Sequence, residues 1–242
     1  MWIRYAESVN KFVIQVRSLA RRSGAIRHLV AIAGRLGLRQ ASYEEKFKTA
    51  LLSAIRPGDT VWDVGANVGL YTVQFAEKVT ASGKVFAFEP APGNFERLRR
   101  ACEATPQVKL LQNALGEKKA TLSLSLSEDP DGVASSFVGS EAGAKSVSVD
   151  VLSADDVIAQ NLATPANVMK IDVEGFEHEV IRGMSALVTN PSLRAIFMEV
   201  HFSLLEAKGD PFAPMEIEKK LVSSGFKTRW LDASHLEALR TA

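Results

Sequence analysis

The sequence predicts an α/β domain built on a doubly wound, mostly parallel sheet. From Thr60 onward, apolar runs of strand length alternate with patterns of helical periodicity. Several of these runs end in an acidic or other polar residue, as strands do when a loop on the sheet edge carries function. At 242 residues and 46% hydrophobic composition, the chain is long enough for one large domain with an appendage.

The expected elements follow one another in the order of a doubly wound sheet. Each apolar run is rich in β-branched or aromatic residues, and each intervening segment repeats its apolar residues every three to four positions. Parallel strands are expected at 60–64, 85–89, 108–113, 168–172 and 195–201, and helices at 68–79, 94–104 and 176–188.

Two hairpins are expected in addition to the parallel strands. Segments 120–126 and 146–151 alternate polar and apolar residues on either side of the Gly-, Ser- and Asp-rich stretch 127–143. This pattern predicts a hairpin with a mobile loop inserted after the third strand. Segments 226–231 and 235–240 predict a C-terminal antiparallel hairpin.

The charge distribution predicts a basic helical N-terminal extension, residues 1–55, before a domain at 56–242. The first 60 residues hold eleven Lys and Arg against four Asp and Glu, although the net charge of the chain is only +1. Apolar residues recur there at amphipathic-helix spacing. Two helices that cap the domain are the simplest interpretation. Contact with an anionic membrane surface, contact with an acidic partner and an organellar presequence remain alternatives.

Composition also indicates the cellular location of the protein and the state of its cysteine. No apolar stretch reaches the about 18 residues of a membrane span, and the N-terminus lacks a clear signal sequence, so a cytoplasmic location is expected. The one cysteine, Cys102, has no internal disulfide partner and is expected to be a packed thiol. No oligomeric state follows from the sequence.

The first candidate site is a glycine loop behind the strand at 60–64, where Asp63 precedes Gly65, Asn67 and Gly69. The spacing matches neither the dinucleotide fingerprint nor the phosphate-binding loop, so pyrophosphate and ATP are not expected. The ligand class that remains for this loop is a nucleoside that carries an amino-acid tail, and S-adenosylmethionine is its common case. An ordinary tight turn is the structural alternative.

Two carboxylates complete this first site. Asp63 lies at the strand tip, where it can meet the cationic ammonium end of such a ligand directly or through water. Glu89 ends the next strand and is a natural partner for two vicinal ribose hydroxyls.

The second candidate site comprises Lys170, Asp172, Glu199 and His201, at the carboxyl ends of two later strands. If these strands are neighbours, the four side chains converge. His201 suits proton removal from an acceptor hydroxyl, because the ordinary pKa of histidine is about 6.5, and Asp172 can orient the acceptor or the histidine. Lys170 and Glu199 are further catalytic candidates, with a structural ion pair as the open alternative.

The other chemistry-bearing residues have simpler interpretations. Asp172, Glu199 and His201 are of metal-ligand type, but the lysine beside them neutralises the same carboxylates, so no metal is expected. His28, His178 and His235 lack comparable neighbours in the sequence and are interpreted as structural.

Four segments, 63–69, 113–116, 170–177 and 199–201, together resemble the FkbM family of S-adenosylmethionine-dependent methyltransferases. The resemblance covers about residues 55 to 205. It implies a Rossmann-like class I methyltransferase fold with a seven-stranded sheet, and O-methylation of a hydroxyl on a sugar, polyketide or related metabolite. It also implies cofactor contacts by residue: the methionine part at Asp63, Gly65, Asn67 and Gly69, the ribose at Glu89, and the adenine at Asn113 and Ala114.

The sequence lacks the motifs of two competing enzyme classes, the short-chain reductases and the nucleic-acid methyltransferases that flip a base. No tyrosine is followed, four residues further on, by the lysine of the Tyr-x-x-x-Lys pair that a short-chain reductase needs, and no Pro-Pro turn is present to hold a flipped base. We therefore expect a small-molecule or glycan acceptor and no nucleic acid. A catalytically inactive binding or scaffold protein with the same fold is the alternative, although its expected loss of the glycines or polar cluster is absent.

Overall fold

The computed structural model describes residues 40–126, 135–136 and 145–241. Most of the predicted loop at 127–143 therefore lies outside the described residues.

The chain divides into two compact units, residues 1–48 and 49–242. Of the first unit, only the beginning of helix α3 (Gln40–Ala54) is described, and this helix continues into the second unit. The predicted basic extension at 1–55 thus lies largely outside the described residues. Within the described ranges, no helix has the length and apolar character needed to cross a bilayer.

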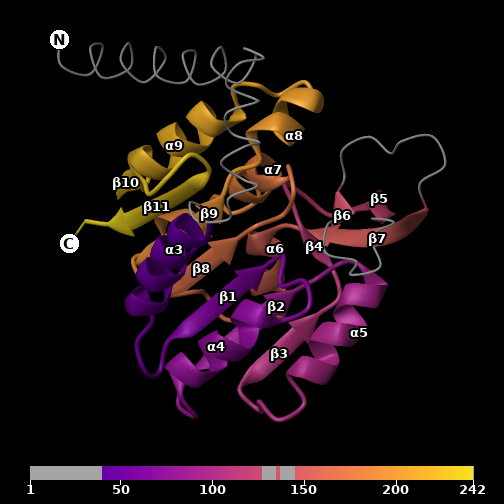
Figure 1. The fold of residues 1–242 in the computed structure, drawn as a ribbon, viewed down its shortest axis with the longest axis vertical. Helices are drawn as coiled ribbons and strands as arrows, with labels where there is room; N and C mark the ends of the chain where they lie inside the picture. Colours follow the sequence, from indigo (N-terminus) through magenta and orange to yellow (C-terminus); the bar gives the residue numbers. More distant parts are fainter. Residues whose placement is uncertain (1–39, 127–134, 137–144, 242) are drawn as a thin grey trace. The chain divides into compact units, whose positions relative to one another are not determined.

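The second unit is built on a seven-stranded sheet with the order β10-β11-β9-β8-β1-β2-β3 (Figure 1). All strands run parallel except β11, which is antiparallel to both of its neighbours. This arrangement confirms the predicted doubly wound sheet and the C-terminal hairpin. The strands are β1 (Thr60–Val64), β2 (Lys84–Phe88), β3 (Val108–Leu111), β8 (Val168–Ile171), β9 (Ala195–Glu199), β10 (Phe226–Trp230) and β11 (His235–Arg240).

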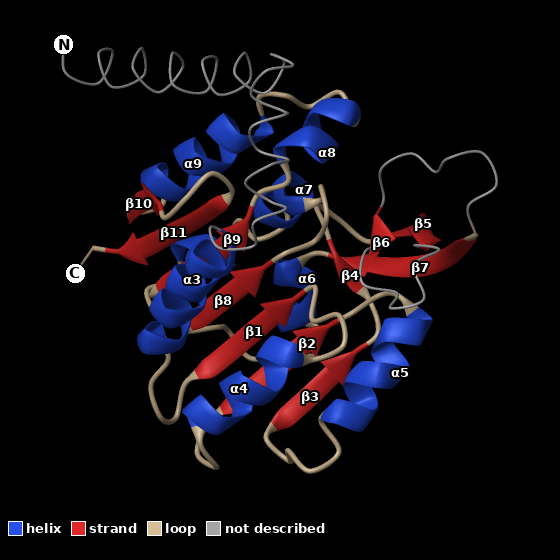
Figure 2. Cartoon of the chain, in the orientation of Figure 1, coloured by secondary structure: helices blue, strands red, loops and turns tan. Residues whose placement is uncertain are grey.

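Helices connect these strands and cover both faces of the sheet (Figure 2). Phe86 and Phe88 of β2 pack into the core over α6, α7 and α9, whereas Ala87, which lies between them in the strand, packs with Leu98 and Cys102 beside α5. This alternation is the two-residue period of a strand buried on both faces. The helices are α4 (Leu70–Val79), α5 (Pro92–Ala101), α6 (Ala154–Ala159), α7 (Glu177–Arg182), the 3₁₀-helix η1 (Leu187–Thr189), α8 (Phe202–Ala207) and α9 (Ala213–Ser223).

A second, four-stranded sheet has the order β4-β7-β5-β6. Its antiparallel β5–β7 pair confirms the predicted inserted hairpin. Leu124 and Val149 of this pair pack against Ala91, just after β2, so the hairpin lies beside the end of the main sheet. The strands are β4 (Ala114–Leu115), β5 (Ala120–Leu126), β6 (Ser135–Ser136) and β7 (Ser146–Leu152).

Two of the predicted boundaries that are wrong lie near the candidate site. Strand β9 ends at Glu199, so His201 is not a strand residue but precedes α8 with φ −89° and ψ 74°. The helix expected at 176–188 ends at Arg182. Gly183 follows it, and a Cβ there would lie 1.8 Å from the Gly116 carbonyl oxygen, so the chain is pressed against another backbone where the helix stops.

Gly65 joins the three central strands at their carboxyl ends. Its amide donates to the Phe88 carbonyl over 3.0 Å, and the Asp172 amide donates to the Val64 carbonyl over 3.0 Å. Gly65 has φ 78°, and a Cβ at this position would lie 1.8 Å from the Asp172 carbonyl oxygen. The glycine is therefore required by backbone packing between the β1 and β8 loops.

Gly65→Ala should destabilise the domain by about 2–4 kcal/mol, because it adds an atom to a filled contact and forces a side chain into the left-handed region. Gly93→Ala is the matched control, since a Cβ at Gly93 in α5 meets nothing within 4 Å. Urea unfolding of both variants measures the difference. A loss below about 1 kcal/mol for Gly65→Ala would contradict the packing argument.

Candidate active site

A cavity opens at the carboxyl ends of β1, β2 and β8, the edge where ligands bind in open α/β sheets. The space between its walls is about 570 Å³ when the open solvent at its mouth is included. It is lined by Val64, Gly65, Asn67, Phe88, Glu89, Pro90, Asn94, Ala114, Leu115, Leu124, Asp172, Val173 and Glu174.

Glu89 is the buried carboxylate of this cavity. Its two oxygens accept hydrogen bonds from the Asn67 and Ala91 amides, each over 2.9 Å. Burial raises the pKa of Glu89 to about 7, even though both hydrogen bonds favour the charged form. Because each oxygen keeps a further lone pair, Glu89 can still accept a hydroxyl from a ligand in the cavity.

The predicted cofactor residues divide into two groups. Gly65, Asn67, Glu89 and Ala114 line the cavity, as does the predicted catalytic residue Asp172.

Asp63, Gly69 and Asn113 lie behind the cavity wall. A Cβ on Gly69 would lie 2.9 Å from Leu98 Cδ1, so packing against α5 accounts for that glycine. The Asn113 side chain donates to the carbonyl of Ala114 over 2.9 Å. Their proposed contacts with a cofactor remain predictions, and the geometry gives all three a supporting position.

Lys170 occupies the centre of a buried ion-pair network. Its Nζ lies 3.4 Å from Asp63 Oδ1 and 3.4 Å from Asp172 Oδ2, and it donates to the Gly65 carbonyl over 3.0 Å. Thr72 donates to the other oxygen of Asp63 over 2.6 Å. Burial alone would lower the pKa of Lys170, but Asp63 and Asp172 raise it above its ordinary value. This geometry favours the structural alternative for Lys170.

His201 is surrounded by carboxylates. Its Nδ1 lies 2.8 Å from Oε1 of Glu177, which is fully buried, and its Nε2 lies 3.2 Å from Glu174 Oε2 and 3.9 Å from Asp172 Oδ1. Burial lowers the pKa of His201, but the hydrogen bond and charge of Glu177, together with the charges of Glu174 and Asp172, raise it to about 9. At neutral pH His201 is therefore mostly a cation, contrary to the ordinary pKa assumed from the sequence.

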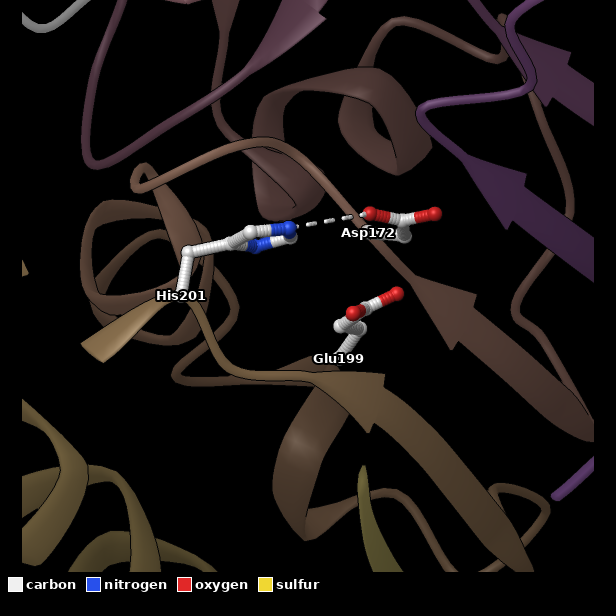
Figure 3. Close-up of side chains that lie close together, drawn as sticks. All are labelled: Asp172, Glu199 and His201. Atoms are coloured by element: carbon white, nitrogen blue, oxygen red, sulfur yellow. Dashed lines mark ion pairs between the residues drawn. The ribbon is translucent and has the colours of Figure 1, made fainter. Parts of the chain in front are cut away.

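Glu199 points toward Asp172 and His201 from the end of β9 (Figure 3). One potential ligand atom from each of the three residues lies within 4.8 Å of the others, so the predicted convergence of β8 and β9 is observed. Such a set can hold a cation. Lys170 and His235 each pair with one of its carboxylates, and the absence of a metal remains a prediction.

Sequence reasoning missed three polar residues here. Glu174 and Glu177 belong to the segment after β8, and the alternation rule failed because the chain leaves the strand at Asp172. The interpretation of His235 as isolated is wrong, since its Nε2 lies 3.5 Å from Glu199 Oε2. His178 also has charged neighbours, at Asp210 and Glu216. Only the pairing of β11 with β9, which the sequence does not specify, would have revealed the contact of His235.

The sheet order and the ligand cavity at its carboxyl edge define a class I methyltransferase fold. The family model described as the methyltransferase FkbM domain matches residues 63–228, and the chain belongs to this family. The predicted family and fold are therefore confirmed. Family and fold indicate S-adenosylmethionine as the cofactor, in agreement with the prediction from the glycine loop.

Curated relatives match the same region. The hexuronic acid methyltransferase AglP of Haloferax volcanii is 28% identical over 165 residues, 68% of this chain and 65% of the relative. The 31-O-demethyl-FK506 methyltransferase FkbM of Streptomyces tacrolimicus is 30% identical over 176 residues, 61% of this chain and 67% of the relative. The alignment with AglP thus spans less than two thirds of that protein.

Solved structures with low sequence identity share the fold. A Clostridium thermocellum protein described as an rRNA methylase has a TM-score of 0.53 at 11% identity, covering 82% of this chain and 95% of its own. A Streptococcus mutans protein described as a methyltransferase, solved with SAH, has a TM-score of 0.51 at 10% identity, covering 84% and 97%. At such identities the likeness concerns the fold alone.

Lys170→Met should destabilise the domain by about 3–5 kcal/mol, because it leaves Asp63 buried without its cation. Arg99→Met is the control, since Arg99 pairs with Glu96 on the surface and such pairs contribute below about 1 kcal/mol. Denaturant unfolding measures both. Equal, small losses would show that the Lys170 network is not a stabilising element.

The imidazole of His201 should titrate by NMR with a pKa of about 9 in the wild-type chain. Glu177→Gln should lower that pKa toward its ordinary value, because it removes a negative charge that stabilises the imidazolium. His201→Gln identifies the resonance among the four histidines of the chain. An unchanged pKa in Glu177→Gln would mean that Glu177 does not control the protonation of His201.

Proposed function

We propose that this chain transfers a methyl group from S-adenosylmethionine to a hydroxyl of a sugar, polyketide or related metabolite. The observation that carries the proposal is the position of Asp172. It lines the cavity at the carboxyl ends of β1, β2 and β8 and also lies 3.9 Å from His201 Nε2, so the proposed places for the cofactor and for proton transfer share this residue.

The cavity suits a nucleoside with an amino-acid tail. Backbone and polar groups of Gly65, Asn67 and Glu89 line one part, and Ala114, Leu115 and Leu124 line an apolar part. The proposed assignment places the ribose at Glu89 and the adenine against the apolar residues. The bound cofactor would supply a methyl group that its sulfonium has already activated.

The remaining chemistry is removal of a proton from the acceptor hydroxyl. Glu177 holds Nδ1 of His201, so in the neutral tautomer the lone pair lies on Nε2, on the side of Asp172 and Glu174. In this form Nε2 accepts the proton of the hydroxyl, and the negative charge of Asp172, 3.9 Å away, stabilises the imidazolium that results. Because the pKa of His201 is about 9, raising the pH toward 9 increases the fraction of the active form.

The relatives support the choice of acceptor. One is described as a methyltransferase of a hexuronic acid and another as a methyltransferase acting at a 31-O position. A hexuronic acid is itself a polyhydroxylated sugar derivative. Both descriptions favour a small-molecule or glycan acceptor over a nucleic acid.

Calorimetric titration with S-adenosylmethionine, with NAD as the parallel control, tests the cofactor site. Saturable binding of S-adenosylmethionine alone is expected. Glu89→Gln should weaken this binding about 10- to 100-fold, as expected for hydrogen bonds to a charged group. His201→Gln should leave the affinity within about twofold and lower methyl transfer to a methyl glucuronoside, followed by mass spectrometry, by about 10²- to 10⁴-fold.

The outcomes separate the parts of the proposal. Binding of NAD instead of S-adenosylmethionine would contradict the cofactor site. Unaltered turnover in His201→Gln would remove this residue from the mechanism. Tight cofactor binding without methyl transfer to any hydroxylated sugar would favour the scaffold alternative.

A further inference from the structure

The C-terminal hairpin contributes a histidine to the site. In the β11–β9 register His235 lies opposite Glu199, and its Nε2 is 3.5 Å from Glu199 Oε2. The other ring nitrogen, Nδ1, lies 2.7 Å from Asp232 Oδ2. Asp232 is itself fixed, because its Oδ1 accepts hydrogen bonds from the amides of Ser234 and His235, each over 2.9 Å. Glu199 is thus held by a chain of contacts that the mechanism above does not use.

Glu199 and Asp172 have the same arrangement. Each is held by a basic side chain, Lys170 for Asp172 and His235 for Glu199. Each side chain also stays partly exposed, 29% for Asp172 and 35% for Glu199, so both reach the solvent side of the site. The hydrogen bond from His235 lowers the pKa of Glu199, which keeps this carboxylate ionised. An ionised carboxylate only accepts hydrogen bonds, so the complementary ligand must present donors.

We infer that Glu199 binds a second hydroxyl of the acceptor, that His235 positions Glu199 for this contact, and that the acceptor therefore carries a vicinal diol. This inference rests on the proposed function, in which His201, beside Asp172, takes the proton of the hydroxyl that is methylated. Glu199 and His235 then determine specificity and do not remove the proton.

The geometry suits two adjacent hydroxyls. The ligand atoms of Asp172, Glu199 and His201 lie within 4.8 Å of one another, and hydroxyl-to-carboxylate hydrogen bonds are about 2.5–3.0 Å long. One of two hydroxyls on neighbouring ring carbons can therefore donate to His201 while the other donates to Glu199. An acceptor with one hydroxyl would displace water from Glu199 and offer that carboxylate no donor of its own, which sites of this kind discriminate against strongly.

The test compares trans-1,2-cyclohexanediol with cyclohexanol, which lacks the second hydroxyl. Binding to the full chain is measured by NMR titration in the presence of S-adenosylhomocysteine. The wild type should bind the diol about 10- to 100-fold more tightly than the mono-ol. Glu199→Gln should reduce this preference to about twofold or less, since an amide is a weaker acceptor than a carboxylate.

Variants of the hairpin test the positioning role. His235→Leu should lose most of the diol preference, and His235→Gln, which keeps a donor toward Glu199, should retain part of it. Glu237→Gln is the matched control: it breaks the pair between Glu237 and Arg229 on the same hairpin and should keep the full preference.

Several results would overturn the inference. These are equal affinities for the two probes in the wild type, no detectable binding of the diol, or an unchanged preference in Glu199→Gln. Tight Mn²⁺ binding that Glu199→Gln abolishes would also overturn it, by showing a metal site in place of a diol site. Because cofactor binding is measured separately, failure here with S-adenosylmethionine still bound leaves the proposed function intact.

Discussion

The buried contact between Lys170, Asp63 and Asp172 is the constraint on which the site depends. It joins the carboxyl ends of β1 and β8 at the place where the cavity begins. A lysine that is 3% exposed is tolerated only with its charge paired, and here both carboxylates and the Gly65 carbonyl surround Nζ. The same contact fixes the Asp172 backbone, whose carbonyl oxygen leaves room only for glycine at position 65. The loop at Gly65 and the segment at Asp172 are therefore held together by the charge of Lys170.

Around this contact the site carries more carboxylates than basic groups, and that imbalance raises the pKa of both histidines. A proton on His201 or His235 lowers the electrostatic energy despite the cost of burial. The imbalance also favours a ligand that brings positive charge or hydrogen-bond donors. The carboxylates are Asp63, Asp172, Glu174, Glu177, Glu199 and Asp232, and the basic groups are Lys170, His201 and His235.

The sequence was sufficient for the fold and for the gathering of candidate residues at one edge of the sheet, because periodicity and strand-end polarity are local signals. It located Asp172, Glu199 and His201 together since parallel strands end at one edge. It was insufficient for the supporting contacts of these residues. His235 reaches Glu199 only through antiparallel pairing across 36 positions of sequence separation, and Glu177 reaches His201 only because the chain turns sharply after β8. The contact of Gly69 with a ligand stays a prediction, and the structure adds that this glycine has φ 93° and packs against Leu98 of α5.

The two carboxylate–histidine pairs of the site differ in which partner faces the ligand. Glu177 is fully buried behind His201, so the imidazole reaches the solvent side and its protonation state is what a substrate meets. In the second pair the order is reversed: His235 is 12% exposed and Glu199 35%, so the carboxylate is presented and the histidine supports it. One pair is therefore arranged to exchange a proton and the other to accept a hydrogen bond. An enzyme that must distinguish the hydroxyl it methylates from its neighbour needs both kinds of contact side by side.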